Sequence, residues 1–120
     1  MQAMSKRRAR RPPATPYLGE FEQLLLLAVL QCGDDPYTVP IRRLLSERAG
    51  RQVARGALHT SLDRLEAKGL VTSAMGEPLA IRGGRSRRYF RVTPAGVEAL
   101  RAARAAVSTL SQGLEELLGR

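Results

Sequence analysis

The chain of 120 residues suits one domain, and its 43% of hydrophobic residues can bury a real but small core. No run of 18 apolar residues could cross a membrane as a helix, and the basic N-terminus lacks the apolar region of a signal peptide. The single cysteine, Cys32, excludes an intramolecular disulfide, and its distance in sequence from His59, the only histidine, matches no metal site. We therefore expect a cytoplasmic protein without a metal or other cofactor.

The net charge of +9 is unevenly distributed along the chain. Residues 1–16 carry +5 and residues 55–91 carry +5, whereas residues 17–54 carry −1 and residues 92–120 carry zero. A clustered excess of this kind favours a polyanionic partner such as nucleic acid. A high-GC genome would explain the preference for arginine over lysine, but it would not explain the clustering.

Residues 1–16 are basic, polar and interrupted by prolines, so we expect a disordered arm. The arm either adds phosphate contacts through residues such as Arg7 and Arg8 or is an unstructured leader. Phosphate contacts from such an arm would add affinity and little sequence preference.

Two helices are predicted next, over residues 18–31 and 38–49. The first is apolar nearly all round and must be covered nearly all round, so a second subunit is expected to cover part of it. Thr38 or Val39 is expected to cap the second helix, and Gly50 to end it. The outer face of the second helix carries Arg42 and Arg43, which are either solvated or close to a phosphate.

Residues 55–68 are predicted as a third helix, with Leu58, Leu62 and Leu65 facing a core and Gly69 as the stop. Its opposite stripe is small or polar. Two short helices, a break and a third helix are typical of a helix-turn-helix. We expect this third helix to enter the major groove of a DNA duplex with the residues Arg55, Gly56, His59, Thr60 and Arg64. On the same face, Asp63 would accept from a cytosine amino group, orient a neighbouring arginine or stay solvated.

A basic hairpin is predicted after the third helix, with a strand that begins over residues 70–72 and a returning strand at Tyr89, Phe90 and Val92. Glycines and a proline mark the turn between them. Its arginines are expected to reach phosphates or the adjacent minor groove: Arg82, Arg85, Arg87 and Arg88. Because side chains alternate along a strand, not all four can touch DNA together.

One long helix is predicted over residues 94–118, capped by Thr93 and weakened near its end by Gly113. Apolar residues recur there every seven positions in two interleaved series, which is typical of a two-helix seam. Packing on the chain's own core is the alternative, but a helix of ~37 Å is longer than so small a domain needs. The expected dimer interface combines residues of the first and last helices: Leu26, Leu27, Leu30, Leu100, Val107, Leu110, Leu114 and Leu117.

The predicted fold is thus mainly α with a small β-hairpin, and its order of elements resembles a winged helix. The details that carry a closer resemblance span residues 18–118: Leu25 to Leu30, Tyr37, Ile41, Gly56-Ala57-Leu58-His59, Leu62, Arg64-Leu65-Glu66, Lys68-Gly69-Leu70-Val71, Arg87-Arg88-Tyr89-Phe90, Val92-Thr93, Gly96 and Leu100. They are similar to the PadR family of bacterial transcriptional regulators, in its short subfamily with one C-terminal helix. Two positions depart from the family: Ala54 replaces the usual Ser or Thr cap, and His59 replaces a Tyr that faces DNA in the family.

The resemblance implies a winged helix domain over residues 17–93 and a dimerisation helix over residues 94–120. It also implies a homodimer that binds a roughly palindromic operator on double-stranded DNA, represses transcription and is often released by a small-molecule effector. A protein-interaction module is the alternative, in which the hairpin arginines dock on an acidic protein. The basic residues of both helix and hairpin favour DNA. An enzyme is not expected, because His59 has no paired carboxylate beyond Asp63 and no nucleotide-type glycine motif is present.

Overall fold

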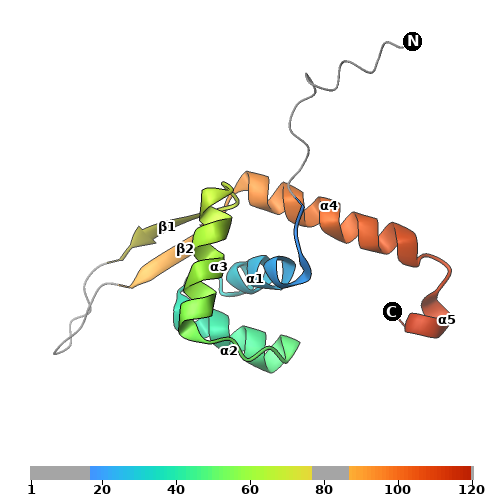
Figure 1. Cartoon of the computed structure of the whole chain (residues 1–120), viewed down its shortest axis with the longest axis horizontal. Coiled ribbons are helices and arrows are strands. Elements are labelled where there is room, and N and C mark those ends of the chain that lie inside the picture. The colour runs from blue at the N-terminus through green and yellow to red at the C-terminus, as the bar shows by residue number, and fades with distance from the viewer. Residues whose placement is uncertain (1–16, 77–86, 120) are drawn as a thin grey trace, which may run out of the picture.

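The computed structural model describes residues 17–76 and 87–119 (Figure 1). Within these ranges the elements follow in the order α1 (Glu20–Gln31), α2 (Thr38–Ala49), α3 (Arg55–Ala67), β1 (Val71–Met75), β2 (Arg88–Val92), α4 (Pro94–Ser111) and α5 (Glu115–Leu118). The described part is therefore mainly helical with one two-stranded antiparallel hairpin, as the sequence predicted. The predicted basic arm, with Arg7 and Arg8, and the hairpin arginines Arg82 and Arg85 lie outside the described residues.

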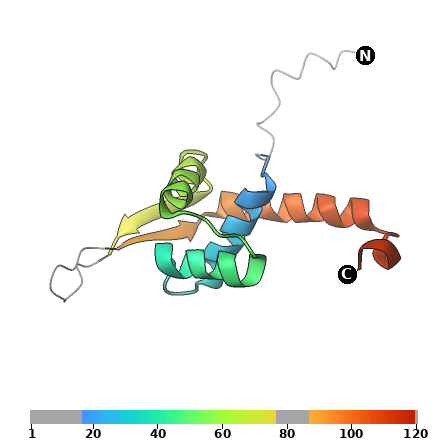
Figure 2. The same ribbon diagram turned by 60° about the horizontal axis from the view of Figure 1, so that its bottom comes forward.

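Helix α1 lies at the centre of the fold and contacts α2, β2 and α4 (Figure 2). Its Leu25 and Leu26 are fully buried, and they share one core with Ile41 of α2, Leu62 of α3 and Phe90 of β2. Burying an aliphatic side chain of this size stabilises the fold by about 1.5–3 kcal/mol. This core holds the three helices and the hairpin in fixed relative positions.

The helix ends follow local chemistry with small differences from the prediction. Helix α1 begins at Glu20 because the amide of Gly19 donates to the carboxylate of Glu22 over 3.0 Å, which closes the first turn. Helix α2 has the predicted bounds, but its N-cap is Tyr37, without a side-chain cap, and neither Thr38 nor Val39. It ends at Gly50, whose φ of 67° is a left-handed conformation that glycine adopts without strain.

The hairpin pairs Val71 with Val92 and Ser73 with Phe90 in antiparallel register. Its second strand is also tied to the turn between α1 and α2, since the amide of Phe90 donates to the carbonyl oxygen of Pro36 over 2.9 Å. The hairpin projects from one end of the molecule and α4 from the other, as both views show (Figures 1 and 2).

The prediction of one continuous last helix was wrong. Helix α4 ends at Ser111, Gln112 leaves the helical region with a ψ of 134°, and Gly113 takes a φ of 87° before the short helix α5 begins. Glycine costs a helix about 1 kcal/mol relative to alanine, and here the cost ends the helix instead of weakening it. The seven-residue spacing therefore does not continue from α4 to Leu114 and Leu117 along one axis. None of the described helices is long and apolar enough to cross a lipid bilayer.

Candidate DNA-binding surface

The exposed face of α3 is held outward by three leucines on its opposite side. Leu58, Leu62 and Leu65 are fully buried, and helical geometry then turns the predicted recognition residues away from the core. The structure leaves four of these residues exposed and one half-buried: Arg55, Gly56, Thr60 and Arg64 are exposed, and His59 is half-buried. The five predicted residues thus lie on one accessible helical surface. Helix α3 itself lies next to the hairpin (Figure 1).

The first turn of α3 has no side-chain cap. The N-cap is Ala54, which has no oxygen on its side chain to accept from the free amides of the turn. These amides and the positive end of the helix dipole therefore remain available to an anion such as a DNA phosphate.

The two arginines of α2 lie close to the loop that leads into α3. Both Arg42 and Arg43 are exposed, and the Nε of Arg42 donates to the carbonyl oxygen of Val53 over 2.9 Å. Arg42 thus helps to fix the loop before the recognition helix, a role that the sequence did not suggest because the two residues lie 11 positions apart.

The hairpin arginines point to opposite faces of the sheet. Pairing places Arg88 and Phe90 on the face that packs on α3, and Tyr89 and Arg91 on the outer face. On the outer side, the guanidinium of Arg87 lies 4.2 Å from the centre of the Tyr37 ring, and the rings of Tyr37 and Tyr89 meet edge to face. The side chain of Arg87 is thus held on an aromatic pair beside the hairpin.

Arg88 forms ion pairs and hydrogen bonds within the chain, whereas the sequence predicted that it would contact DNA from the hairpin. Its Nη2 lies 2.9 Å from Oδ1 of Asp63 and 2.9 Å from Oε1 of Glu66, and its Nε donates to Oγ of Ser73 over 3.1 Å. The prediction for Asp63 included orienting a neighbouring arginine, and the structure shows this contact.

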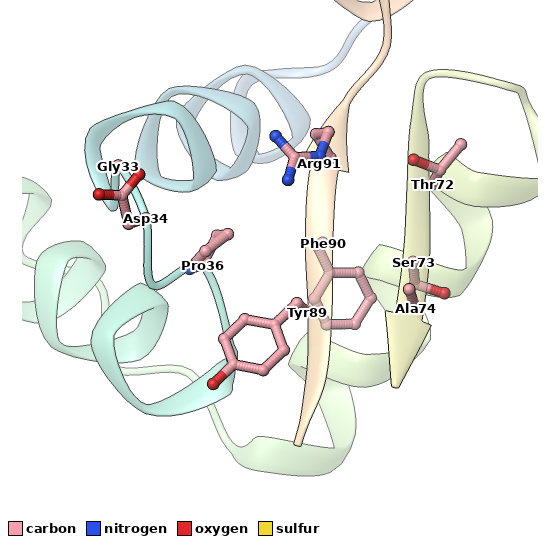
Figure 3. Close-up of a pocket in the computed structure, with 9 residues that line it drawn as sticks. All are labelled: Gly33, Asp34, Pro36, Thr72, Ser73, Ala74, Tyr89, Phe90 and Arg91. Carbon is pink, nitrogen blue, oxygen red and sulfur yellow. The ribbon is translucent and has the colours of Figure 1, made fainter. Parts of the chain in front are cut away.

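Sequence reasoning missed Arg91, which is exposed on the outer face of β2. It lines a shallow pocket of about 290 Å³ between the hairpin and the turn that joins α1 to α2 (Figure 3). The side chains of Tyr89 and Arg91 project from β2 to the side on which Asp34 and Pro36 lie. Side chains alternate along a strand, so Arg91 lies on the same face of β2 as Tyr89. This alternation is the sequence signal that could have identified Arg91 as a further basic residue of the hairpin.

The predicted dimer residues separate into two groups. Leu26 and Leu100 are 0% and 5% exposed because they pack in the chain's own core, so they are not open to a second subunit and that part of the predicted interface is corrected. Leu27 is half-buried. The other predicted residues are exposed: Leu30, Val107, Leu110, Leu114 and Leu117.

Cys32 is half-buried at the end of α1, and burial raises the pKa of its thiol, with the charge of Asp35 acting in the same direction. The thiol is therefore less reactive than a free cysteine at neutral pH. In the described part of the chain, no three His, Cys, Asp or Glu residues come together as metal ligands.

Three helices, a hairpin directly after the third helix, and exposed basic residues on both define a winged helix-turn-helix DNA-binding protein. The model of the transcriptional regulator PadR-like family matches residues 26–102, and the chain belongs to this family. Proteins of this family regulate transcription by binding DNA and are not enzymes.

The chain is also similar to individual proteins. It is 42% identical to the transcriptional regulator Rv3488 of Mycobacterium tuberculosis over 72 residues, which are 60% of this chain and 61% of the relative, so the match spans about three fifths of the relative's length. A solved PadR family transcription regulator from Clostridium difficile matches with a TM-score of 0.63 and 24% identity, over 81% of this chain and 97% of that one. A PadR family regulator from Eggerthella lenta matches with a TM-score of 0.61 and 26% identity, over 80% and 81% of the two chains.

Proposed function

We propose that the protein is a sequence-specific, DNA-binding repressor that acts as a homodimer in the cytoplasm. The observation that carries the proposal is the exposed face of α3, where Arg55, His59 and Thr60 lie outward next to a basic hairpin. Arginine donates to the edge of guanine, and a threonine hydroxyl or an imidazole donates to base edges or phosphates, so this set can read a major groove. Gly56 allows close approach because it lacks a side chain, and a Cβ built there meets no atom within 4 Å.

The hairpin and α2 supply the electrostatic part of the proposal. Phosphate contacts provide most of the non-specific affinity of DNA-binding proteins and depend steeply on salt. We assign this part to Arg43 of α2, to Arg87 and Arg91 of the hairpin, and to Arg82 and Arg85 in the turn between its strands. Arg42 and, in the arm, Arg7 and Arg8 add to the same field.

A homodimer would place two copies of α3 on the two halves of a palindromic operator. Exposed apolar residues of α1, of α4 and of the segment that follows α4 support this assembly, because a subunit interface would remove them from water: Leu30, Val107, Leu110, Leu114 and Leu117. In this proposal residues 17–93 form the DNA-binding domain, and residues 94–120 supply most of the assembly surface, with Leu30 of α1 added to it.

One way for a small-molecule effector to release DNA is to change the position of the hairpin. The pocket in Figure 3 suits this role, because Pro36 and Phe90 both line it and share the hydrogen bond that ties β2 to the turn between α1 and α2. A ligand wedged between them would displace the hairpin. A bound ligand of this kind would weaken operator binding and perturb the fluorescence or NMR signals of Tyr89.

The test of the main proposal is fluorescence anisotropy with DNA from immediately upstream of the protein's own gene, compared with scrambled DNA across a salt series. A repressor of its own gene would hold the upstream DNA at salt concentrations that strip the scrambled DNA. Equal and steeply salt-dependent binding to both would contradict sequence specificity at this site. Absence of binding to either at low salt would favour the alternative, a winged helix that docks an acidic protein.

A further inference from the structure

One guanidinium joins the hairpin to the recognition helix. Arg88 opens β2, and it contacts Asp63 and Glu66, which lie three positions apart on α3. Ser73 of β1 completes the network, since its hydroxyl accepts from Nε of Arg88 and donates to Glu66 over 3.0 Å. The guanidinium carbon also lies 4.9 Å from the centre of the Phe90 ring. The hydrogen bonds of this network join different secondary-structure elements, and the contact with Phe90 stacks the guanidinium on a core residue.

The network is partly shielded from water, which makes its geometry specific. The side chains of Arg88 and Glu66 are 31% and 35% exposed, and only Asp63, at 59%, is largely in solvent. Charge-assisted hydrogen bonds that share one planar guanidinium fix orientation more strictly than a single surface ion pair does. Both Nε and Nη2 of Arg88 point into the protein's own carboxylates and hydroxyl, so they are directed away from a phosphate.

The charges matter because Asp63 lies one turn beyond His59 and Thr60 on the face that would meet DNA. Two uncompensated carboxylates within about a Debye length of the phosphates, ~8 Å in physiological salt, would repel the backbone. Arg88 brings a positive charge to within 2.9 Å of both carboxylates. This reduces the net charge of the three side chains beside the recognition residues from about −2 to about −1, so the repulsion of the phosphates is smaller.

We propose that Arg88 is a positioning residue of the DNA-binding surface: it locks the hairpin onto α3 and partly offsets the negative charge of Asp63 and Glu66, and it is not a phosphate ligand. This inference rests on the proposed DNA-binding function. It assigns to Arg88 a role different from that of its neighbour Arg87, which precedes β2 and whose guanidinium lies on the Tyr37 ring, outside this network.

A double-mutant cycle on DNA affinity tests the proposal. The wild type, Arg88→Gln, Asp63→Asn/Glu66→Gln and the triple variant are titrated against one duplex at one salt concentration. We expect Arg88→Gln to weaken binding ~10-fold in the wild type and by less than ~2-fold in the Asp63→Asn/Glu66→Gln background, because the carboxylates it holds are gone. An equal fold-loss in both backgrounds would mean that Arg88 contacts the phosphates itself and would overturn the proposal.

Arg91→Gln is the matched control, because Arg91 lies on the same strand, carries the same charge and faces the other side of the sheet. In the described part of the chain Arg91 forms no ion pair. Its fold-loss should be the same in both backgrounds, which shows that the cycle detects a specific partner and not total charge. Where Arg88→Gln does not fold, Arg88→Lys tests the lock alone in the same cycle, since it keeps the charge but cannot reach three partners from one plane. A loss of affinity that disappears in the Asp63→Asn/Glu66→Gln background supports the lock, and an equal loss in both backgrounds overturns it.

Amide hydrogen exchange tests the lock without DNA. The amide of Gly76 donates to the carbonyl oxygen of Arg87 over 2.7 Å at the end of the hairpin. We expect Arg88→Gln to speed exchange at Gly76 ~10-fold and Arg91→Gln to change it by less than ~2-fold. Unchanged exchange in Arg88→Gln would overturn the lock. If the wild type binds no duplex, the proposed function is refuted. The exchange experiment needs no DNA, so it still decides whether Arg88 locks the hairpin onto α3.

Discussion

The hydroxyl of Thr93 donates a 2.7 Å hydrogen bond to the carbonyl oxygen of Gly69 and accepts one from the amide of Gly96. The same residue's amide donates to the carbonyl oxygen of Leu70. One threonine therefore joins the end of the recognition helix to the start of α4. In a dimer assembled through α4, this joint would transmit the spacing between subunits to the two recognition helices.

Replacing Thr93 by alanine should lower the free energy of unfolding by about 1–2 kcal/mol, since it removes a helix cap and a hydrogen bond to Gly69. Urea denaturation followed by circular dichroism measures the change. Thr109→Ala is the control, because Thr109 is exposed in the same helix and its loss should change stability by less than about 0.5 kcal/mol. Equal effects of the two variants would contradict the joint.

Gly96→Ala and Gly56→Ala should change stability in opposite directions. A Cβ at Gly96 would overlap the carbonyl oxygen of Leu70 and the side chain of Val92, whereas one at Gly56 meets open space. Overpacking at Gly96 should cost about 1–3 kcal/mol, while alanine in the open site at Gly56 should add up to ~1 kcal/mol of helix propensity. Thermal unfolding of the two variants measures both signs, and a stabilised Gly96→Ala would show that α4 does not need this close approach.

Glu22 should contribute to an acid-dependent loss of stability. Burial raises the pKa of its carboxyl, but the hydrogen bonds from Lys68 at 2.7 Å and from the amide of Gly19 outweigh burial, so the pKa lies below its ordinary value. Because the folded pKa is lowered, the stabilisation is fully present above the ordinary value of about 4.3 and is lost as pH falls through the folded pKa.

The measurement is the free energy of unfolding of the wild type and Glu22→Gln between pH 6 and pH 3, a range of ~3 units that brackets the ordinary glutamate pKa. The difference between the two proteins should be largest at the upper end and shrink toward the lower end. Glu98→Gln serves as the control, since the Glu98 carboxylate is 65% exposed and, among the described residues, pairs with Arg101 alone, at 3.3 Å. A constant difference for Glu22→Gln across the range would contradict the lowered pKa.

The intact protein should sediment as a dimer at micromolar concentration, and Leu110→Glu should shift it toward the monomer. Leu110 is 82% exposed on α4, and a buried carboxylate at a subunit interface is strongly unfavourable. Ala105→Glu lies on the other side of the same helix, by the helical repeat, and should leave the dimer intact. A wild type that sediments with the mass of one chain would refute the proposed assembly.

Arg43→Ala and Arg87→Ala should each reduce the slope of log affinity against log salt by ~1, the value for one lost phosphate contact on duplex DNA. The titration uses anisotropy with one duplex at several salt concentrations. Arg101→Ala, on exposed α4 and outside the proposed surface, should leave the slope unchanged. An unchanged slope for Arg87→Ala would remove the hairpin from the phosphate-binding surface and leave its guanidinium as a stacking partner of Tyr37.

The sequence by itself determined the local structure and the class of the protein. The bounds of α2 and α3, the stop at Gly69 and the cap at Thr93 depend on apolar periodicity and on side chains within a few residues of one another, which can be read along the chain. The resemblance to the PadR family and the mainly helical fold with one hairpin were also confirmed. Both predictions rest on the order of the elements and on short motifs, which the sequence shows directly.

Only the tertiary structure decided which charged and apolar residues are free. Arg88 meets Glu66 across 22 positions, and Leu26 and Leu100 are buried because α1 and α4 pack in one core. The break of the last helix at Gly113, where φ is 87°, was not predicted either, although the glycine itself is visible in the sequence. Burial and ion pairing arise from contacts between residues distant in sequence, so periodicity and composition indicate which side chains carry charge but not which of them remain available to DNA or to a second subunit.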